Sequence, residues 1–361
     1  MTKRSLSLLC ILLGVAGFCA VPFIVGVHDL LETISQVGGL GVIIFVVNAS
    51  GTVVIPAIGW WLIMRAEGLP VSLGVTLQTN FMGYPLNVLT PSMFLGGEPL
   101  KTFYLASRYQ IPKRRVLATI MVAKFQELGG LILSMLVGAA LFIWHADYLT
   151  LWFDVLLITL LAVLVSLFSL TFYAFVRRGR PLVIFLTFLV RCHIFPRLVE
   201  KLFNLAAELE ELIYQTLTNR PRVLLLSQAV TCFSAITIFL RPWIFFRTLP
   251  HLAIGFDQLC ALFVLTNLVN SFTIIPGGLG LFEATMVGYA SLAQLGDDKG
   301  AALALISRIA DLTFLIIGGC LIFYHGLERI ARSRDTAFVP ADTLSLPMSA
   351  PPPDDEDEAP G

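Results

Sequence analysis

The chain has 361 residues, of which 57% are hydrophobic and 13% charged, and its mean hydropathy is +0.84. This composition excludes a compact soluble domain, because the chain has too little polar surface to cover its apolar area in water. The formal net charge of zero hides a split: of 24 acids, five lie in residues 354–358, so the rest of the chain carries +5. We therefore expect an integral membrane protein with an acidic tail.

Runs of about 20 apolar residues, the length that an α-helix needs to cross a bilayer, recur along the chain. They lie at residues 5–27, 37–64, 116–144, 148–176, 223–246, 256–275 and 301–325. They are apolar on every face, whereas the strands of a membrane β-barrel alternate, so we predict an all-α polytopic helix bundle. We interpret the first run as a retained helix rather than a signal peptide, because no small-residue cleavage site follows Pro22.

Motifs for metals and cofactors are missing from the sequence. The six cysteines and five histidines are scattered without a CxxC or HExxH pattern, and the glycine-rich residues 276–280 lack the Lys-Ser/Thr of a phosphate-binding loop. We expect no metal, no cofactor and no nucleic-acid partner.

Positive charges recur in alternate loops, which the positive-inside rule assigns to the cytoplasm. These loops hold Lys3 and Arg4, Arg65, residues 108–115, 177–180, 191–222 and 329–334. Both termini are then cytoplasmic, and Arg241 and Arg247 depart from the pattern. Residues 180–219 are amphipathic, and we predict a segment on the cytoplasmic surface, either packed under the bundle or in contact with lipid.

Residues 71–105 and 256–296 do not fit as single spans, because each must return to the side from which it starts. Both are interrupted by polar or helix-breaking residues. These are Asn80, Pro85, Asn87, Pro91, Gly96, Gly97 and Glu98 in the first, and Asn267, Asn270, Pro276, Gly277, Gly278, Gly280 and Glu283 in the second. Broken backbone at membrane depth persists only where protein or a wet cavity surrounds it, so we predict two re-entrant hairpins.

The two hairpins share a layout in which a proline precedes a glutamate by seven residues: Pro91 and Glu98, then Pro276 and Glu283. The helix after each hairpin carries a cation and an acid three residues apart, on one helix face: Lys124 with Glu127, then Arg308 with Asp311. With the orientation above, one copy enters from the cytoplasm and the other from outside. We therefore predict two inverted repeats, a construction typical of carriers.

Polar side chains from both copies are expected to line one pocket. They are Asn87, Glu98, Lys101, Lys124, Glu127, Asn270, Glu283, Arg308 and Asp311. The alternative is that these charges only hold helices together as buried ion pairs and bind no substrate. The nearby aromatic residues Trp60, Trp61, Tyr84, Tyr104 and Trp243 are interpreted as packing or interface anchors.

The stretch from Pro91 to Arg108, together with the helix that carries Lys124 and Glu127, resembles the transmembrane domain of lysylphosphatidylglycerol synthases. Residues 276–283 and 308–311 resemble the second conserved block of that family, and the resemblance spans about residues 5–330. It implies a flippase-like domain in a bacterial or archaeal cytoplasmic membrane that moves aminoacylated, hopanoid-linked or glycosylated lipids.

Two departures from the family pattern limit what the resemblance implies. Full-length synthases append a soluble aminoacyl-transfer domain, and this chain has an acidic tail there, so synthase activity is not expected. Where the family carries arginine, the chain has Pro99, Lys101 and Lys124, which keep charge but lose bidentate phosphate geometry.

The hypothesis from sequence is therefore a lipid carrier. Lys101, Lys124 and Arg308 would hold an anionic or sugar-bearing headgroup, and the acids would position these cations or exchange protons. Two alternatives remain open, an intramembrane enzyme that transfers a group to a lipid and a scaffold for a separate lipid-modifying partner enzyme. We expect a membrane domain over residues 1–334 and a disordered acidic, proline-rich tail over residues 335–361.

Overall fold

The computed structural model describes residues 27–90, 96–145, 151–191, 196–249, 254–272 and 275–337. The predicted span at 5–27 lies outside these residues except for its last position, and the tail after residue 337 lies outside them as well. The chain divides into two units, residues 1–321 and 322–361. The second unit contains the end of the last helix, from Ile322 to Ala337.

The described residues are helical and contain no strand. The helices are α2 (Val27–Ala66), α3 (Leu73–Leu89), α4 (Glu98–Tyr109), α5 (Lys113–His145), α6 (Leu151–Val176), α7 (Pro181–Arg191), α8 (Pro196–Asn219), α9 (Pro221–Thr248), α10 (Phe256–Phe272), the 3₁₀ turn η1 (Pro276–Gly278), α11 (Leu281–Leu292) and α12 (Asp297–Ala337). Within the described ranges, α2, α5, α6, α9 and α12 are long and apolar enough to cross a bilayer. The prediction of an all-α polytopic membrane bundle is confirmed.

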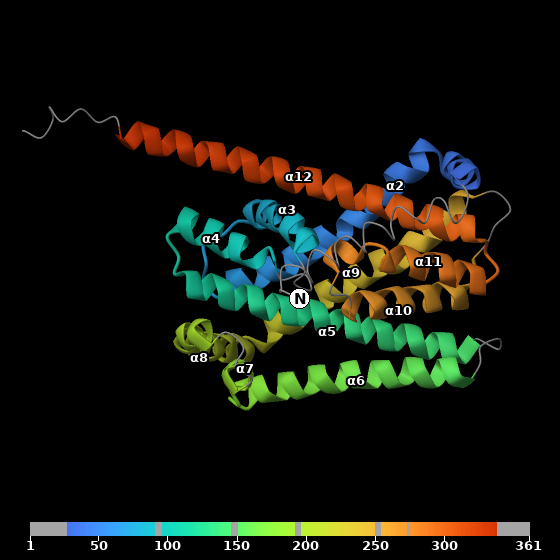
Figure 1. The fold of residues 1–361 in the computed structure, drawn as a ribbon. Helices are drawn as coiled ribbons and strands as arrows, with labels where there is room; N and C mark the ends of the chain where they lie inside the picture. The colour runs from blue at the N-terminus through green and yellow to red at the C-terminus, as the bar shows by residue number, and fades with distance from the viewer. Residues whose placement is uncertain are drawn as a thin grey trace, which may run out of the picture. The chain divides into compact units, whose positions relative to one another are not determined.

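The two long helices α2 and α9 pack antiparallel along the middle of the bundle (Figure 1). Gly38 interrupts α2 with φ 67° and ψ 165°, a backbone conformation that suits glycine, and the segment after this kink is similar in length to α9. Small residues bring the two helices together. A Cβ added at Gly51 would lie 2.6 Å from Thr237 Cγ2, and one at Gly59 would lie 3.1 Å from Ser227 Oγ.

Both predicted breaks are present, and the two hairpins have matching lengths. The helices α3 and α10 have 17 residues each, and α4 and α11 have 12 residues each. The connections at 90–97 and 273–280 are also equal in length. In the first hairpin the backbones nearly touch, because a Cβ at Gly97 would lie 2.3 Å from Gly83 O. In the second, Tyr289 donates its hydroxyl hydrogen to Gln258 O at 2.7 Å.

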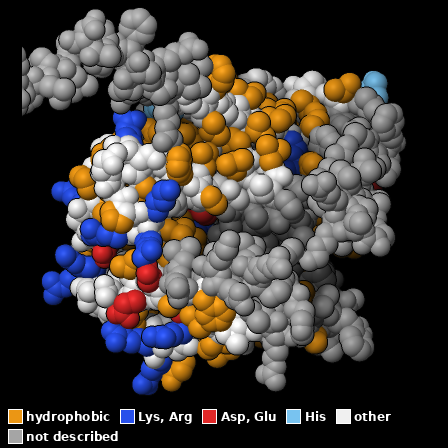
Figure 2. Space-filling view, turned by 60° about the vertical axis from the view of Figure 1, so that its left-hand side comes forward, with side chains coloured by type: hydrophobic (Ala, Val, Ile, Leu, Met, Phe, Trp, Pro, Cys, Tyr) orange, Lys and Arg blue, Asp and Glu red, His pale blue; other side chains and the backbone are white. Residues whose placement is uncertain are grey.

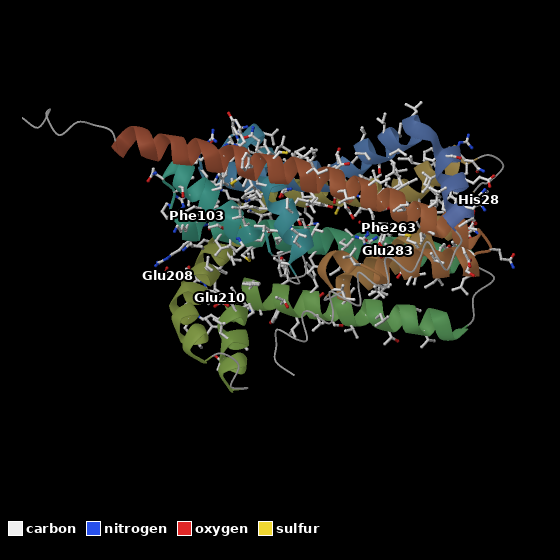
Figure 3. All side chains as sticks on the ribbon, turned by 45° about the horizontal axis from the view of Figure 1, so that its top comes forward. His28, Phe103, Glu208, Glu210, Phe263 and Glu283 are labelled. Carbon is white, nitrogen blue, oxygen red and sulfur yellow. The ribbon has the colours of Figure 1, made fainter. Side chains whose placement is uncertain are left out.

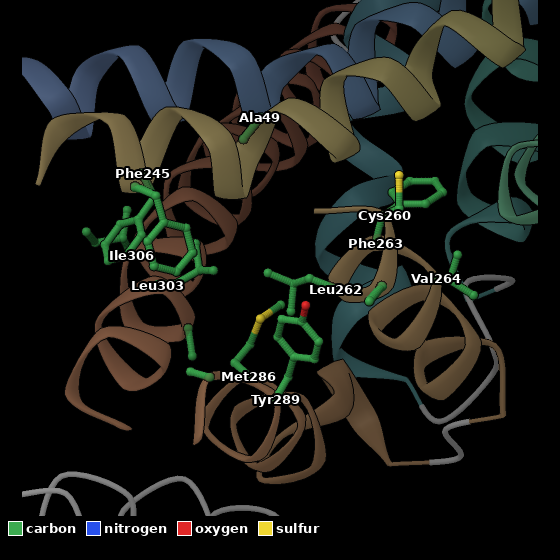
Figure 4. Close-up of a cluster of buried hydrophobic side chains, with 14 of the residues drawn as sticks. Ala49, Phe245, Cys260, Leu262, Phe263, Val264, Met286, Tyr289, Leu303 and Ile306 are labelled. Atoms are coloured by element: carbon green, nitrogen blue, oxygen red, sulfur yellow. The ribbon is translucent and has the colours of Figure 1, made fainter. Parts of the chain in front are cut away.

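Two hydrophobic cores hold the hairpins toward opposite ends of the long helices. The core around α10 and α11 contains Phe245, Leu262 and Met286 (Figure 4). The core around α4 contains Trp60 and Leu105. The helix α5 spans both cores, since its first half packs near α4 and its second half near α10 (Figure 1).

The helix that follows each hairpin packs against the other hairpin. The helix α5 follows the first hairpin and contacts α10, where a Cβ at Gly138 would lie 3.0 Å from Val264 Cγ2. The helix α12 follows the second hairpin and contacts α3, where a Cβ at Gly318 would lie 2.2 Å from Phe81 O. The two halves of the chain are therefore reciprocally packed.

The amphipathic segment forms α7 and α8 and packs on the bundle. Leu209 and Ile213 of α8 belong to the core around α4, so its apolar face is buried against protein. Glu210 Oε1 accepts the N–H groups of Leu182 and Val183, the second at 3.3 Å, and thereby caps the start of α7. The packing of α8 leaves Ile184 of α7 61% exposed.

Charge divides the two ends of the first unit. The end that holds α4 and α8 is rich in exposed basic residues, which gather on one side of the surface in Figure 2. These are Arg65, Arg108, Lys113, Arg114, Arg115, Arg177, Arg178, Arg180, Arg220 and Arg222. The opposite end carries acids at Glu32, Asp257, Asp297 and Asp298. Apolar side chains are exposed between the two ends, as a lipid-facing surface requires.

Candidate functional site

The first charge cluster consists of Glu98, Lys101, Lys124 and Glu127, where α4 meets α5. Glu98 Oε1 lies 3.3 Å from Lys101 Nζ and 3.6 Å from Lys124 Nζ. Lys124 also lies 2.7 Å from Glu127 Oε2. Two acids and two cations thus alternate in one chain of contacts, which offsets much of the cost of burying each charge.

Lys101 sits at the inner side of this cluster and is 3% exposed. It donates to Asn80 Oδ1 at 2.8 Å and lies 5.9 Å from the ring centre of Trp60. The hairpin break above it is held by Asn87, whose Oδ1 accepts the N–H of Gly97 at 2.6 Å. Gly97 therefore allows the backbones to approach, and Asn87 fixes them there.

A small cavity opens at the first charge cluster. It is lined by Pro56, Trp60 and Asn80 as well as by the four charged residues, and its volume is about 10 Å³. That is room for roughly one water molecule. Lys124 and Glu127 are 21% and 28% exposed, so they form the outer side of the cluster.

The second charge cluster consists of Glu283, Arg308 and Asp311, where α11 meets α12 (Figure 3 labels Glu283). Arg308 Nε lies 2.5 Å from Glu283 Oε1, and Arg308 Nη1 lies 3.5 Å from Asp311 Oδ2. Glu283 Oε2 accepts the N–H of Gly280 at 2.7 Å, so the same carboxylate caps α11. Its burial at 2% exposure is thus compensated on both oxygens.

The glycine-rich break of the second hairpin has a direct role in this cluster. Gly277 (φ 61°), Gly278 (φ 62°) and Gly280 (φ 80°) all adopt left-handed backbone conformations. The turn aims the carbonyl oxygen of Gly277 at Arg308, which donates to it from Nη1 at 2.7 Å. The sequence Pro-Gly-Gly-Leu-Gly therefore builds part of an arginine-binding site from backbone.

The helix α3 joins the two charge clusters. One turn apart on α3, Asn80 accepts from Lys101 of the first cluster, and Tyr84 donates to Asp311 Oδ1 of the second at 2.7 Å. The hairpins also approach each other directly, because a Cβ at Gly277 would lie 3.4 Å from Val88 Cγ1. The ionised residues of both halves therefore converge on one helix.

The junction lies near the middle of α2. Asn80 Nδ2 donates to Val53 O at 2.7 Å, and Arg241 Nη2 of α9 donates to Thr52 Oγ1 at 2.8 Å. Arg241 also interacts electrostatically with Asp311 and Tyr84. Since α2 is one of the spanning helices, these contacts at Thr52 and Val53 lie well inside its length, and the first cluster extends from there toward Pro56 and Trp60.

Three buried polar atoms at the site have no hydrogen-bond partner among the described residues. They are Glu98 Oε2, Arg308 Nη2 and Arg241 Nε. The first cluster therefore has an acceptor to offer, and the second has N–H donors. Such atoms are costly to bury unless a water or a ligand satisfies them.

Some predicted site residues are only partly described. Pro91 lies outside the described residues, and the side chains of Asn270 and Pro276 are not described. Gly96 lies in the turn before α4. The structure brings the seven predicted charged residues into two clusters that α3 connects.

Three contributors to the site have roles that the sequence pattern does not indicate. Tyr84 is expected to pack and Arg241 departs from the pattern of loop charges, yet in the structure both interact with Asp311. Asn80 was noted as an interruption of the first hairpin and contacts Lys101. The available signal is an arginine inside the apolar run 223–246, because such a charge faces the inside of a bundle.

The family model for the lysylphosphatidylglycerol synthase TM region matches residues 11–319, which include both charge clusters. A UPF0104 membrane protein from Methanothermobacter thermautotrophicus is 22% identical over 328 residues, with 88% of this chain and 94% of the relative covered. With its bundle of spanning helices, this multi-pass membrane protein therefore belongs to the family of the lysylphosphatidylglycerol synthase transmembrane region.

Proposed function

We propose that the protein moves a lipid with a polar headgroup between the leaflets of a cytoplasmic membrane. The observation that carries the proposal is the convergence of two charge clusters, each with a buried glutamate, on α3, which contacts the spanning helix α2 inside its length at Val53. Charges at this depth cost about 2.5–3.5 kcal/mol per residue in lipid, so they are retained where they serve a polar pathway.

Reciprocal packing of the two halves supports two inverted repeats. Each half contributes a long helix, a 17-residue helix, a break, a 12-residue helix and a second long helix. The hairpins lie toward opposite ends of the bundle, and each contacts the helix that follows the other (Figure 1). Carriers with this construction expose one central site alternately to each side.

The orientation that we propose places the basic end in the cytoplasm. The exposed arginines and lysines gather there, beside α4 and α8. By the positive-inside rule the first hairpin then enters from the cytoplasm and the second from outside, and both termini are cytoplasmic in a bacterium or archaeon.

The headgroup would be held by the atoms that the clusters leave without partners. Arg308 and Arg241 present N–H donors suited to a phosphate or another anion. Glu98 presents an acceptor suited to a hydroxyl or an amine on the same headgroup. The acyl chains would stay in the lipid outside the bundle while the headgroup crosses.

Translocation of a headgroup-labelled phospholipid in proteoliposomes tests this function. The wild type should move label from the outer to the inner leaflet faster than protein-free liposomes do. Glu98→Gln and Glu283→Gln should each slow this movement at least about tenfold, which corresponds to roughly 1.4 kcal/mol in the barrier.

A matched control tests whether the loss of any carboxylate, and not only one at the site, slows translocation. Glu208→Gln removes an exposed carboxylate on α8 that pairs with Arg114. It should leave the rate within about twofold of the wild type. Equal rates for all variants would remove the clusters from the mechanism, and a chemically altered lipid in the same reaction would indicate an enzyme instead of a carrier.

A further inference from the structure

A second cavity lies outside both charge clusters, at the basic end of the first unit. It sits between α8 and the turn that joins α6 to α7, and its volume is about 160 Å³. Six of the residues that line it carry the argument: Phe175, Arg178, Arg180, Glu210, Glu211 and Tyr214. Its walls therefore combine two guanidinium groups, two carboxyl groups and two aromatic rings.

Glu210 is the buried polar residue of this cavity (Figure 3). Its side chain is 5% exposed, and Oε1 accepts the N–H groups of Leu182 and Val183 at the start of α7. Its other oxygen, Oε2, has no hydrogen-bond partner among the described residues. Burial raises the pKa of Glu210, although the two N–H groups and Arg180 act against the rise. The cavity thus offers one carboxyl oxygen to a hydrogen-bonding ligand.

The arginines at the rim differ in how they are held. Arg178 stacks over the ring of Tyr214 at 4.2 Å and pairs with Glu211 at 3.3 Å, so its guanidinium is fixed at the cavity. Arg180 is exposed and interacts electrostatically with Glu210. Both residues have left-handed backbone conformations, with φ 54° and 51°, which residues other than glycine rarely adopt. A tight turn thus holds both residues at the rim.

We propose that this cavity binds a phosphate ester that carries a hydroxyl or amine beside the phosphate. Arg178 and Arg180 contact the phosphate, since guanidinium groups match its geometry, and the neighbouring donor satisfies Glu210 Oε2. A phosphodiester whose headgroup lacks such a donor would leave this carboxyl oxygen without a partner. The chemistry therefore selects a headgroup such as glycerol phosphate over one such as phosphocholine.

The surroundings favour a membrane lipid as the source of this group. The helix α7 begins at the cavity with the apolar sequence Pro-Leu-Val-Ile-Phe-Leu, and Ile184 on it is 61% exposed. A lipid bound by its headgroup would lay its acyl chains along this helix. The site is separate from the charge clusters, so it does not depend on the transport function.

Native mass spectrometry of the purified full-length protein tests the site. The probes are phosphatidylglycerol, phosphatidylcholine and soluble glycerol 3-phosphate. Phosphatidylglycerol should remain bound more tightly than phosphatidylcholine, and Arg180→Ala should weaken its binding at least about tenfold. Arg222→Ala is the matched control, because Arg222 is an exposed arginine at the same end that does not line the cavity. It should change the affinity by less than about twofold.

Each remaining outcome decides a part of the proposal. Binding of glycerol 3-phosphate that is lost in Arg180→Ala, with no preference among the lipids, would retain the phosphate-ester site and overturn the membrane source. The site itself would be overturned if both lipids bound equally and glycerol 3-phosphate did not bind. It would also be overturned if Arg180→Ala and Arg222→Ala weakened binding equally. Thermal unfolding of both variants near the wild-type temperature shows that the comparison is between folded proteins.

Discussion

The side chain of Tyr84, in the first half of the chain, contacts the second half directly. Its hydroxyl donates to Asp311 at 2.7 Å, and its ring packs edge-on against Phe314 at a centroid distance of 5.6 Å. One residue of the first hairpin thus satisfies a carboxylate of the second cluster and contacts the helix that carries it.

Tyr84→Phe should destabilise the protein and slow lipid movement. The ring contact remains, but Asp311 Oδ1, on a partly exposed carboxylate, loses its donor, which costs about 0.5–1.5 kcal/mol. Thermal unfolding in detergent micelles measures the loss. Tyr109→Phe on α4 is the control, since Tyr109 packs against the core around α4 and should shift the transition far less. Equal shifts for the two variants would contradict the role of this hydroxyl.

Glu210 gives the contact between α7 and α8 a pH dependence of known sign. Its pKa is raised above the ordinary value of 4.5 by burial, so the folded state binds this proton more tightly than the unfolded state does. The contribution of Glu210 to stability is therefore complete below pH 4.5 and is lost as the pH rises through the raised pKa.

Glu210→Gln should remove this part of the pH dependence. Thermal unfolding of the wild type and the variant is measured from pH 4.5 upward. As the pH rises, the wild type should lose stability through Glu210, so the transition temperature of the variant should rise relative to that of the wild type. A difference that stays constant with pH, or that moves the other way, would show that the carboxyl does not titrate in this environment.

At the scale of helices, the contact of α12 with α3 is set by one glycine. A Cβ at Gly318 would lie 2.2 Å from Phe81 O, whereas a Cβ at Gly319 meets nothing within 4 Å. The two neighbouring glycines thus differ only in which face of α12 they occupy. Gly318 is buried against the first hairpin.

Gly318→Ala should push α12 away from α3 and weaken the bond between Tyr84 and Asp311. Overpacking of this kind costs about 1–3 kcal/mol, because backbone has to move. Gly319→Ala should be neutral or slightly stabilising, since alanine favours a helix over glycine by about 1 kcal/mol. Unfolding temperatures and translocation rates of the pair measure the effect, and a Gly319→Ala variant as impaired as Gly318→Ala would refute the assignment of the face.

The sequence was sufficient to predict the elements that follow from local physics. The apolar runs after residue 27, the hairpin breaks and the pairing of Lys124 with Glu127 depend on helix periodicity and on glycine and proline, and they appear in the described part of the structure. The contact of Tyr84 with Asp311 joins residues 227 positions apart, and no local pattern specifies it. The same holds for Arg241, whose partner Thr52 lies on another helix.

The sequence also does not show at which position of its helix each of the two glutamates lies. The proline and glutamate spacings match between hairpins, but Glu98 opens α4, whereas Glu283 is the third residue of α11. Glu283 can therefore accept the N–H of Gly280 as a helix cap, and Glu98 is shared between two lysines instead. Equal sequence spacing thus concealed two different ways to hold a buried carboxylate.

At the scale of the whole molecule, the proposed orientation makes a prediction for each end. Thr218 on α8 lies at the basic end and Ser291 on α11 at the other, and both are exposed. In a background without the six native cysteines, Thr218→Cys should react with a membrane-impermeant maleimide only in inverted vesicles. Ser291→Cys should react only in intact cells. Labelling of both from the same side would contradict the inverted arrangement of the hairpins.

The central claim is that the two charge clusters act as one site. In proteoliposomes, the translocation rates of wild type, Glu98→Gln, Glu283→Gln and the double variant form a complete cycle. Residues that work as a unit are not additive, so the double variant should be no more than about threefold slower than the slower single variant. Losses that multiply in the double variant would show two independent sites and contradict the account.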